Sequence, residues 1–243
     1  MTQSLDKPKI TLYCLPFAGG SALSYRDFNN HVAEFIDLKL IDLPGRGRRI
    51  KEPLLTNIEA VVDDILDQIK NEIGTKPYAI YGHSMGTLLG YLLTRRLLNL
   101  NLPAPAHWFF SGRKAPSIVD NDPPKYKLPK PEFIEMLNQL GGAPPEILAH
   151  AELMEFFEPI LRADFEAVET YVHVPTSPLN IPLTILYGSN DKETPYAKLL
   201  PWQQETGQPI SVKEFAGGHF FIFDYLPQLG QLFSETLGRK LRS

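Results

Sequence analysis

A serine flanked by glycines constrains this chain more than any other stretch: Gly82-His83-Ser84-Met85-Gly86. The apolar run before it, residues 77–81, is typical of a buried strand, and residues 87–96 after it have helical spacing. A chain that passes from strand to helix so quickly must turn sharply. Side chains larger than hydrogen at positions 82 and 86 would therefore collide with the neighbouring strand or helix. The turn lifts the Ser84 hydroxyl clear of the sheet, at a helix N-terminus that favours negative charge.

This strand–turn–helix arrangement matches the nucleophile elbow of the α/β-hydrolase fold, although ordinary Gly-rich turns can carry the same letters. The rest of the chain supports the first interpretation. Helical patterns at 25–35, 57–73 and 220–241 alternate with further strand patterns, which we place at residues 9–15, 38–42, 106–112, 183–188 and 212–215. Alternating strands and helices predict an α/β fold with a doubly wound, mostly parallel sheet.

A long segment without strand patterns separates the strands predicted at 106–112 and 183–188. Prolines break its first part, and helical patterns follow at 132–140, 145–157 and 158–171. We predict one α/β-hydrolase domain over residues 1–243, with a helical lid inserted at about 115–172. The apolar lid residues either pack as a core or line a channel for an acyl chain, and they are Phe133, Met136, Leu137, Leu140, Ile147, Leu148, Leu153, Met154, Phe156 and Phe157.

The composition excludes several classes of protein. The net charge of −4 gives no reason to expect binding to nucleic acid or to anionic membranes. Cys14 is the single cysteine, so an intramolecular disulfide is impossible, and the polar residues 1–9 lack the apolar stretch of a signal peptide. No cluster has metal-ligand spacing and no phosphate-binding loop is present. We expect a cytoplasmic, monomeric protein that needs no metal or cofactor.

A serine hydroxyl needs a base to become a nucleophile, and the base needs an orienting acid. In α/β-hydrolases these residues follow in the order Ser, Asp or Glu, His. Here Ser84 is followed by Asp191 at a strand end and by His219 just after the last strand. All three therefore come to the carboxyl edge of the sheet, and we predict that they form a catalytic triad.

The other candidates for the acid, the nucleophile and the base of the triad are weaker. Asp42 also ends a strand, and Glu193 lies in the same loop as Asp191. Cys14 lies inside a strand with no base near it. The other histidines fall in helices, at the opposite edge of the sheet or, for His83, in the elbow with the side chain expected to point away: His31, His83, His107, His150 and His173.

The loop after the first strand, residues 16–22, is rich in small residues. In this fold that loop supplies one N–H group of the oxyanion hole, and the residue after the nucleophile supplies the other. We expect the two donors to be Ala18 and Met85, with Phe17 as the alternative to Ala18.

Taken together, these stretches resemble the stand-alone type II thioesterases of polyketide and nonribosomal peptide synthesis. The resemblance spans nearly the whole chain and is carried by residues 15–21 (LPFAGGS), 43–47 (LPGRG), 82–86 (GHSMG), 161–164 (LRAD) and 217–221 (GGHFF). It implies hydrolysis of acyl groups from the phosphopantetheine thiol of an acyl or peptidyl carrier protein, for editing or for product release. Release of medium-chain fatty acyl groups is a related role that the resemblance leaves open.

Two other functions remain open on the residues alone. An esterase for small oxygen esters would use the same three catalytic residues, and a binding protein with a hydrolase fold would use none. The intact set of Ser84, Asp191 and His219 argues against the binding protein. The absence of a secretion signal and the LPFAGGS and GGHFF stretches favour the thioesterase over the esterase.

Two groups of basic residues are candidates for contact with a carrier protein, which the resemblance implies to be acidic. The arginines follow the second strand, and they are also explained by a solvated loop or by a site for a phosphate. The lysines precede the lid helices. The two groups are Arg46, Arg48 and Arg49, and Lys125, Lys127 and Lys130.

Overall fold

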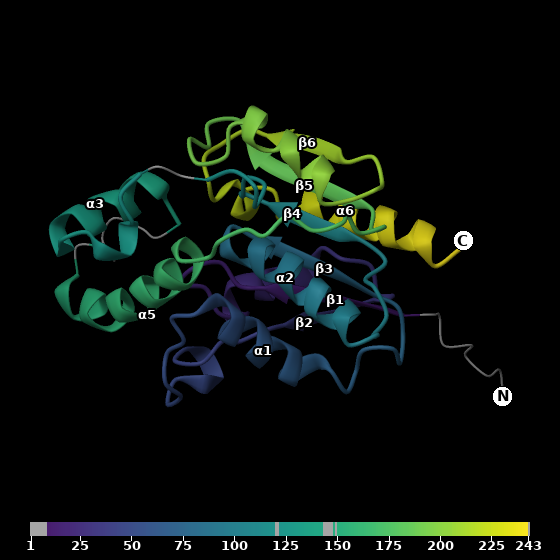
Figure 1. The fold of residues 1–243 in the computed structure, drawn as a ribbon, viewed down its shortest axis with the longest axis horizontal. Coiled ribbons are helices and arrows are strands. Elements are labelled where there is room, and N and C mark those ends of the chain that lie inside the picture. The colour runs from purple at the N-terminus through teal and green to yellow at the C-terminus, as the bar shows by residue number, and fades with distance from the viewer. Residues whose placement is uncertain (1–8, 120–121, 143–147, 149, 243) are drawn as a thin grey trace.

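The computed structural model of the chain describes residues 9–119, 122–142, 148 and 150–242. Within these ranges six strands form one sheet in the order β2-β1-β3-β4-β5-β6, and every neighbouring pair is parallel (Figure 1). The strands are β1 (Ile10–Leu15), β2 (Ile36–Leu40), β3 (Tyr78–His83), β4 (Trp108–Ser111), β5 (Leu183–Gly188) and β6 (Ser211–Phe215). The predicted α/β-hydrolase class, with its mostly parallel sheet, is confirmed.

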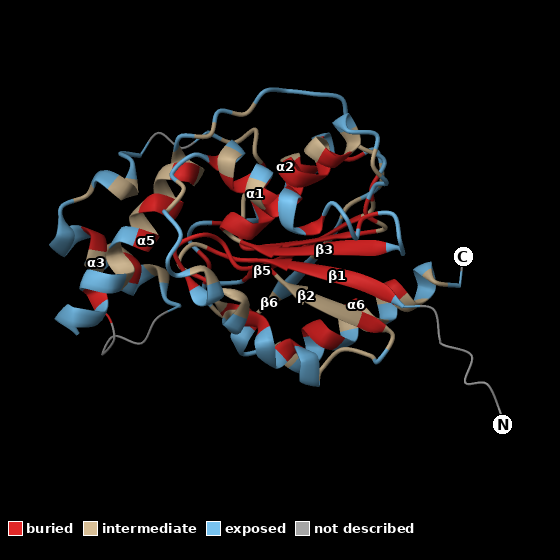
Figure 2. Ribbon diagram, turned by 90° about the horizontal axis from the view of Figure 1, so that it is seen from below, coloured by how far each residue is buried: buried red, intermediate tan, exposed pale blue. Residues whose placement is uncertain are grey.

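Helices cover both faces of the sheet and create two apolar cores (Figure 2). One face carries α1 (Ile58–Ile69) and α2 (Met85–Asn99), and the other carries α6 (Leu226–Lys240). The central strands β1 and β3 are buried along their whole length, as strands covered on both faces must be. Burial of each large apolar side chain contributes about 1.5–3 kcal/mol, so these two cores hold the strand ends in fixed positions.

Local sequence explains where the helices begin and end. Asn57 caps α1, since its side chain accepts hydrogen bonds from the N–H groups of Glu59 (3.0 Å) and Ala60 (3.1 Å). The helix predicted at 25–35 is instead a 3-10 segment, Ala22–Asn30, which ends in two asparagines of low helix propensity. The predicted final helix is divided into a short turn, Phe221–Phe223, and α6, which has a proline in its first turn, where proline is favoured.

The segment between β4 and β5, which we call the lid, leaves the sheet and returns to it. It contains a 3-10 turn (Lys125–Lys127), α3 (Lys130–Leu140) and α5 (Ala151–Glu169). The helical patterns at 145–157 and 158–171, between which the sequence shows no clear break, form one helix from Ala151 on, because α5 continues through Pro159. Burial of Met154, Ile160 and Ala163 along one side of α5 outweighs the backbone hydrogen bond that the proline removes. The part of the prediction at residues 143–147 lies outside the described residues.

Cys14 lies inside β1 with 1% of its surface exposed. Burial raises the pKa of its thiol well above the ordinary value, so the reactive thiolate is absent at neutral pH. This agrees with the expectation that Cys14 is not a nucleophile. Among the described residues, no helix has the length and apolar character that crossing a membrane requires.

His107, just before β4, is buried and has its Nε2 atom 2.9 Å from Thr184 Oγ1. Burial, and to a lesser extent the charge of Lys240, lowers its pKa to about 4. An unfolded histidine has a pKa of about 6.5, so between about pH 6.5 and pH 4 the unfolded chain binds a proton that the folded chain does not. The free energy of unfolding should therefore fall as the pH falls through this range. For this one group the slope is at most about 1.4 kcal/mol per pH unit.

Urea unfolding at about pH 7, 6 and 5 tests this expectation. His107→Gln should show a shallower loss of stability than the unaltered protein. His150→Gln, which changes an exposed histidine, should follow the unaltered protein. Equal slopes in all three proteins would show that His107 does not control acid stability.

Candidate active site

Ser84 occupies a strained turn between β3 and α2. Its φ is +52° and its ψ is −113°, a region that residues other than glycine rarely adopt. A Cβ atom on Gly82 would lie 2.1 Å from the carbonyl oxygen of Gly86, and one on Gly86 would lie 2.3 Å from that of Leu15. Both positions therefore require glycine, as the sequence analysis predicts. The turn presents Ser84 at the N-terminus of α2, in the wall of a large cavity.

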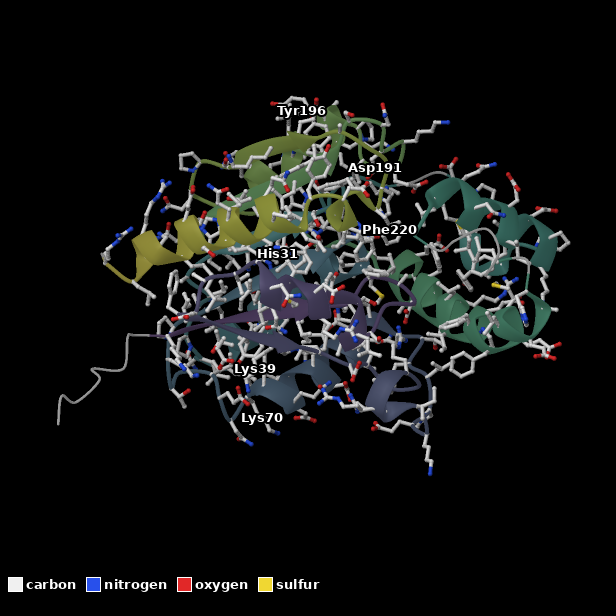
Figure 3. The ribbon with its side chains drawn as sticks, turned by 180° about the vertical axis from the view of Figure 1, so that it is seen from behind. His31, Lys39, Lys70, Asp191, Tyr196 and Phe220 are labelled. Atoms are coloured by element: carbon white, nitrogen blue, oxygen red, sulfur yellow. The ribbon has the colours of Figure 1, made fainter. Side chains whose placement is uncertain are left out.

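Asp191 and His219 come together at the same edge of the sheet. Asp191 Oδ2 lies 2.8 Å from His219 Nδ1, and both residues are almost fully buried. The two loops can approach because Gly188 has no side chain: a Cβ there would lie 2.3 Å from the carbonyl oxygen of Gly218. Seen from behind, Asp191 and Phe220 lie at the end of the sheet that faces the lid (Figure 3).

The surroundings of Asp191 keep it charged. Burial raises the pKa of its carboxyl group, but hydrogen bonds from His219, from the Thr194 hydroxyl (2.5 Å) and from the Glu193 N–H (3.0 Å) outweigh burial, so the pKa lies below its usual value. A charged Asp191 can orient His219 and stabilise its protonated form. Thr194 was missed by sequence reasoning, although its position three residues after Asp191 was a signal for such a local hydrogen bond.

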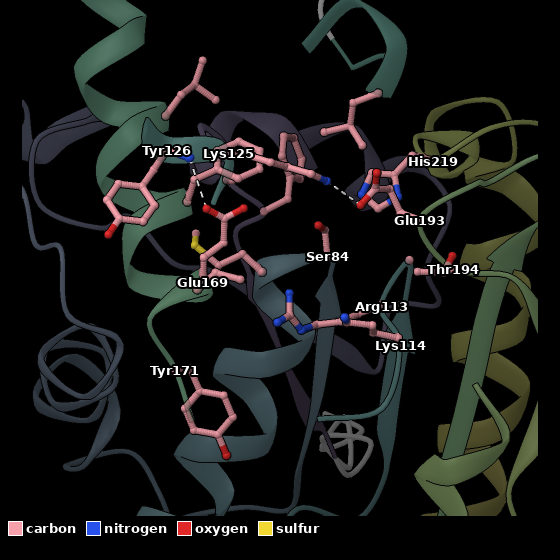
Figure 4. A pocket seen from close by; sticks show the side chains of 18 of the residues that line it. Ser84, Arg113, Lys114, Lys125, Tyr126, Glu169, Tyr171, Glu193, Thr194 and His219 are labelled. Carbon is pink, nitrogen blue, oxygen red and sulfur yellow. Dashed lines mark hydrogen bonds and ion pairs between the residues drawn. The ribbon is translucent and has the colours of Figure 1, made fainter. Parts of the chain in front are cut away.

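Ser84 and His219 face one cavity of about 1090 Å³ (Figure 4). The cavity is lined on one side by the catalytic edge of the sheet and on the other by the inner side of the lid. Of the apolar lid residues singled out from the sequence, Phe133 packs inside the lid, Leu153 and Phe156 are partly exposed, and Ile147 lies outside the described residues. The members of that set that line the cavity are Leu137, Leu140, Leu148, Met154 and Phe157.

The loop after β1 also reaches the cavity. It forms a turn in which the Gly20 N–H donates to the Phe17 carbonyl at 2.8 Å, with Gly19 at a φ of +77°. Ala18 lines the cavity in this turn. Met85 lines it as the first residue of α2, where an N–H has no acceptor within the helix. Both expected oxyanion donors thus border the same space as Ser84.

Asp42 has other partners. It is buried and accepts hydrogen bonds from the Ala22 N–H at 2.8 Å and from Arg48 Nε at 3.1 Å. It therefore joins two loops, and neither of these contacts involves His219. Glu193 pairs with Lys125 at 2.6 Å (Figure 4).

Two further histidines lie near the catalytic edge of the sheet. The ring of His83 is buried 4.9 Å from that of His219, with Nδ1 2.8 Å from Ser111 Oγ, and His83 is not part of the cavity lining. Burial and the nearby His219 lower the pKa of His83, which keeps it neutral. His173 lines the cavity, with Nε2 3.4 Å from Glu205 Oε1. Among the described residues no group of three or more His, Cys, Asp or Glu is placed to hold a metal ion.

The arginine group is not the exposed patch that the sequence suggested. Arg46 is 4% exposed and paired with Asp164 of the lid, so its assignment to an outer docking surface is wrong for this arrangement of the lid. Arg49 is bound to Asp64 at 2.6 Å and also to Glu52. Arg48 remains accessible, with 80% of its side chain exposed, although its Nε contacts Asp42.

The lysine group likewise contains both paired and exposed side chains. Lys125 lines the cavity and pairs with Glu193 at 2.6 Å. Lys130 pairs with Glu158 at 3.1 Å. Lys127 is exposed, and its Nζ lies 5.3 Å from the centre of the Tyr126 ring. Among the six candidate contact residues, Arg48 and Lys127 are therefore exposed, and Lys130 is exposed as well but paired with Glu158.

Comparison with known proteins identifies the family. The family model for the thioesterase domain matches residues 10–237. The chain belongs to the thioesterase family. This thioesterase is 35% identical over 216 residues to the gramicidin S biosynthesis protein GrsT of Aneurinibacillus migulanus, a match that covers 89% of this chain and 84% of GrsT.

Two solved structures are similar throughout. The thioesterase superposes on ClbQ from the colibactin NRPS/PKS pathway with a TM-score of 0.90 and 30% identity, covering 96% of this chain and 98% of ClbQ. It superposes on YbtT, a type II thioesterase from the yersiniabactin NRPS/PKS pathway, with a TM-score of 0.84 and 27% identity, covering 98% and 96% of the two chains. The predicted thioester hydrolase activity and the resemblance to type II thioesterases are confirmed.

Proposed function

We propose that this thioesterase hydrolyses acyl groups from the phosphopantetheine arm of acyl or peptidyl carrier proteins in a polyketide or nonribosomal peptide pathway. The observation that carries the proposal is the 2.8 Å hydrogen bond between Asp191 and His219, in a cavity that also exposes Ser84. The carrier-bound substrate is supported by the relatives, two of which are named for NRPS/PKS pathways.

The chemistry follows from the roles of these three side chains. His219 takes the proton of Ser84 while the serine oxygen attacks the thioester carbonyl carbon, and Asp191 stabilises the resulting imidazolium. The N–H groups of Ala18 and Met85 stabilise the oxyanion. The carbon–sulfur bond then breaks, the sulfur leaves as a thiol with the proton from His219, and an acyl-Ser84 ester remains. A water molecule, deprotonated by His219, attacks this ester, releases the carboxylic acid and restores Ser84.

The form of the substrate can be tested by offering one acyl group on three leaving groups. These are a carrier protein, a small soluble thiol and a small alcohol. The proposal expects kcat/KM to be at least about tenfold higher for the carrier than for the small thiol, because the protein adds binding energy away from the reacting bond. The kcat/KM for the oxygen ester of the small alcohol should be lower still. Equal rates on carrier and small thiol would favour a fatty acyl thioesterase without carrier recognition, and a preference for the alcohol ester would favour a carboxylesterase.

The docking surface gives a further prediction. Arg48 and Lys127 are exposed, so Arg48→Glu with Lys127→Glu should raise the KM for an acidic acyl-carrier substrate severalfold. Each exposed charge contributes only about 0.2–1 kcal/mol, so the effect should be moderate. The KM for a small acyl thioester should not change, because that substrate does not reach these side chains. The difference should shrink between about 50 and 500 mM salt.

A matched control reverses two exposed charges elsewhere, Lys70→Glu with Arg239→Glu. Figure 3 shows Lys70 away from the lid helices, and Arg239 lies near the end of α6. This control should leave the carrier KM near the unaltered value. An equal rise in both double variants would mean that overall charge, and not the proposed surface, controls binding.

A further inference from the structure

A carboxylate of the lid reaches the turn that carries Ala18. Asp164, in α5, is 1% exposed and accepts a hydrogen bond from the Gly19 N–H at 2.7 Å. The same carboxylate is held from a third segment by Arg46, whose Nη2 lies 2.7 Å from Oδ1 and whose Nη1 contacts Oδ2. Three stretches far apart in the sequence thus meet at one buried group.

The hydrogen bond to Gly19 selects one form of the turn. With Gly19 at a φ of +77° as the third residue, and the Gly20 N–H bonded to Phe17, the turn from Phe17 to Gly20 is of type II. Type I and type II turns differ in the orientation of the central peptide, which here joins Ala18 to Gly19. If this peptide flipped, the Ala18 carbonyl oxygen would replace the Gly19 N–H in front of the Asp164 carboxylate, and the two oxygens would repel each other.

Leu161 adds an apolar contact from the same face of α5, since it precedes Asp164 by three residues. A Cβ atom on Gly19 would lie 2.6 Å from Leu161 Cδ2, which shows how closely the lid helix covers the turn. Both contacts come from one helix, so any movement of α5 away from the sheet removes them together.

Arg46 keeps the carboxylate suited to this role. The bidentate contact with Arg46 fixes the plane of the carboxylate, so that one of its oxygens faces the Gly19 N–H. Arg46 itself is buried, and its Nε has no partner among the described residues, so its contact with Asp164 is its main polar interaction.

We propose that Asp164, oriented by Arg46, is a positioning residue that holds the turn from Phe17 to Gly20 in its catalytic form only while α5 lies against it. The Ala18 N–H belongs to the peptide before the one that could flip, and the hydrogen bond from the Gly20 N–H to the Phe17 carbonyl holds that preceding peptide. Asp164 therefore acts on the Ala18 donor by anchoring the next peptide, and so the position of the whole turn, while α5 lies against it. This proposal rests on the proposed function, since it assumes that Ala18 stabilises the oxyanion formed by attack of Ser84.

The first experiment separates transition-state stabilisation from substrate binding. Asp164→Leu, which removes the acceptor of the Gly19 N–H, should lower kcat for a small acyl thioester by about 10²-fold, near the cost of losing one oxyanion donor. The affinity for an alkyl boronic acid, which adds to Ser84 and places an oxygen in the oxyanion hole, should fall by a similar factor. The affinity for the matching unreactive thioether should change less than about threefold, because that ligand has no oxyanion.

The matched control is Asp64→Leu. It removes a partly buried contact of Arg49, in the same loop as Arg46, without touching the turn at Gly19. It should leave kcat and both affinities unchanged. An equal loss of boronic acid and thioether binding in Asp164→Leu would overturn the proposal, as would an unchanged boronic acid affinity.

A second variant separates a loss of catalysis from a loss of stability. Arg46→Met with Asp164→Leu replaces the buried ion pair by apolar side chains, an exchange that other proteins often tolerate. The melting temperature should stay close to that of the unaltered protein, while kcat should remain about 10²-fold low because Gly19 still lacks its acceptor. Recovery of kcat in this stable double variant would show that Asp164 acts only through stability.

A measurement on the unaltered protein needs no variant. The Gly19 amide should exchange its hydrogen slowly with solvent, because its acceptor is buried. Exchange at the rate of an unprotected amide would refute the contact in solution, whether or not the variants fold. Amide exchange and boronic acid binding do not depend on thioester turnover, so the proposed substrate could be wrong without affecting either result.

Discussion

Ser84→Ala is expected to reduce turnover of an acyl thioester by roughly 10⁴- to 10⁶-fold, and His219→Ala by a similar factor, because the triad acts as a unit. Ser84 is the nucleophile in the proposed mechanism, and neither alanine variant can form the acyl-enzyme at a useful rate. The expected measurement is single-turnover hydrolysis of a small acyl thioester, with folding checked by circular dichroism.

Chemical labelling gives an independent readout of the same assignment. A serine-directed phosphonate should add one label, on the peptide that contains Ser84, and should add none to His219→Ala. His150→Ala, which changes an exposed histidine, should label and turn over as the unaltered protein does. Retention of more than a few per cent of activity in Ser84→Ala, or labelling at another serine, would disprove the nucleophile assignment.

Asp191→Asn is expected to lower kcat by about 10⁴-fold while the fold persists. The amide has nearly the same shape as the carboxylate, but it cannot stabilise the imidazolium, and its NH₂ group can hold His219 in the wrong tautomer. The loss should appear mainly in kcat, since Asp191 is buried behind His219 and does not line the cavity.

The two rival acids provide the comparison. Glu193→Gln should change kcat only a few-fold, because the side chain of Glu193 pairs with Lys125 and only its N–H contacts Asp191. Asp42→Asn should weaken the loop contacts to Ala22 and Arg48 and lower stability more than kcat. If Asp191→Asn kept a tenth of the activity while Asp42→Asn lost most of it, the acid would be Asp42.

Much of the fold could be predicted because its signals are local. The apolar runs of β1, β3 and β5 mark buried parallel strands, and the glycines around Ser84 mark a turn in which a Cβ has no room. The hydrogen bond between Asp191 and His219 agrees with the triad expected from the sequence, because strand ends in a parallel sheet meet at one edge.

The contacts of the lid could not be predicted in the same way. Arg46 and Asp164 are separated by 118 residues, and each alone has the features of a solvated charge. Their pairing depends on how α5 lies on the sheet, which no local pattern specifies. The signal that could have found them was that both fall in stretches that carry the family resemblance, residues 43–47 and 161–164. The sequence shows no clear break between the helical patterns at 145–157 and 158–171, and α5 does continue through Pro159, since tertiary packing outweighs the local effect of a proline.

The position of Cys14 has a practical consequence for observing the lid. It is the one cysteine in the chain and is closed off inside β1, so the folded protein carries no thiol that a maleimide dye reaches readily. A cysteine introduced at Phe156, which is 48% exposed on α5, would therefore react selectively. A second cysteine introduced at Lys70, outside the lid, would allow fluorescence energy transfer between two dyes to report lid opening during turnover. The protein without these two cysteines would serve as the unlabelled control.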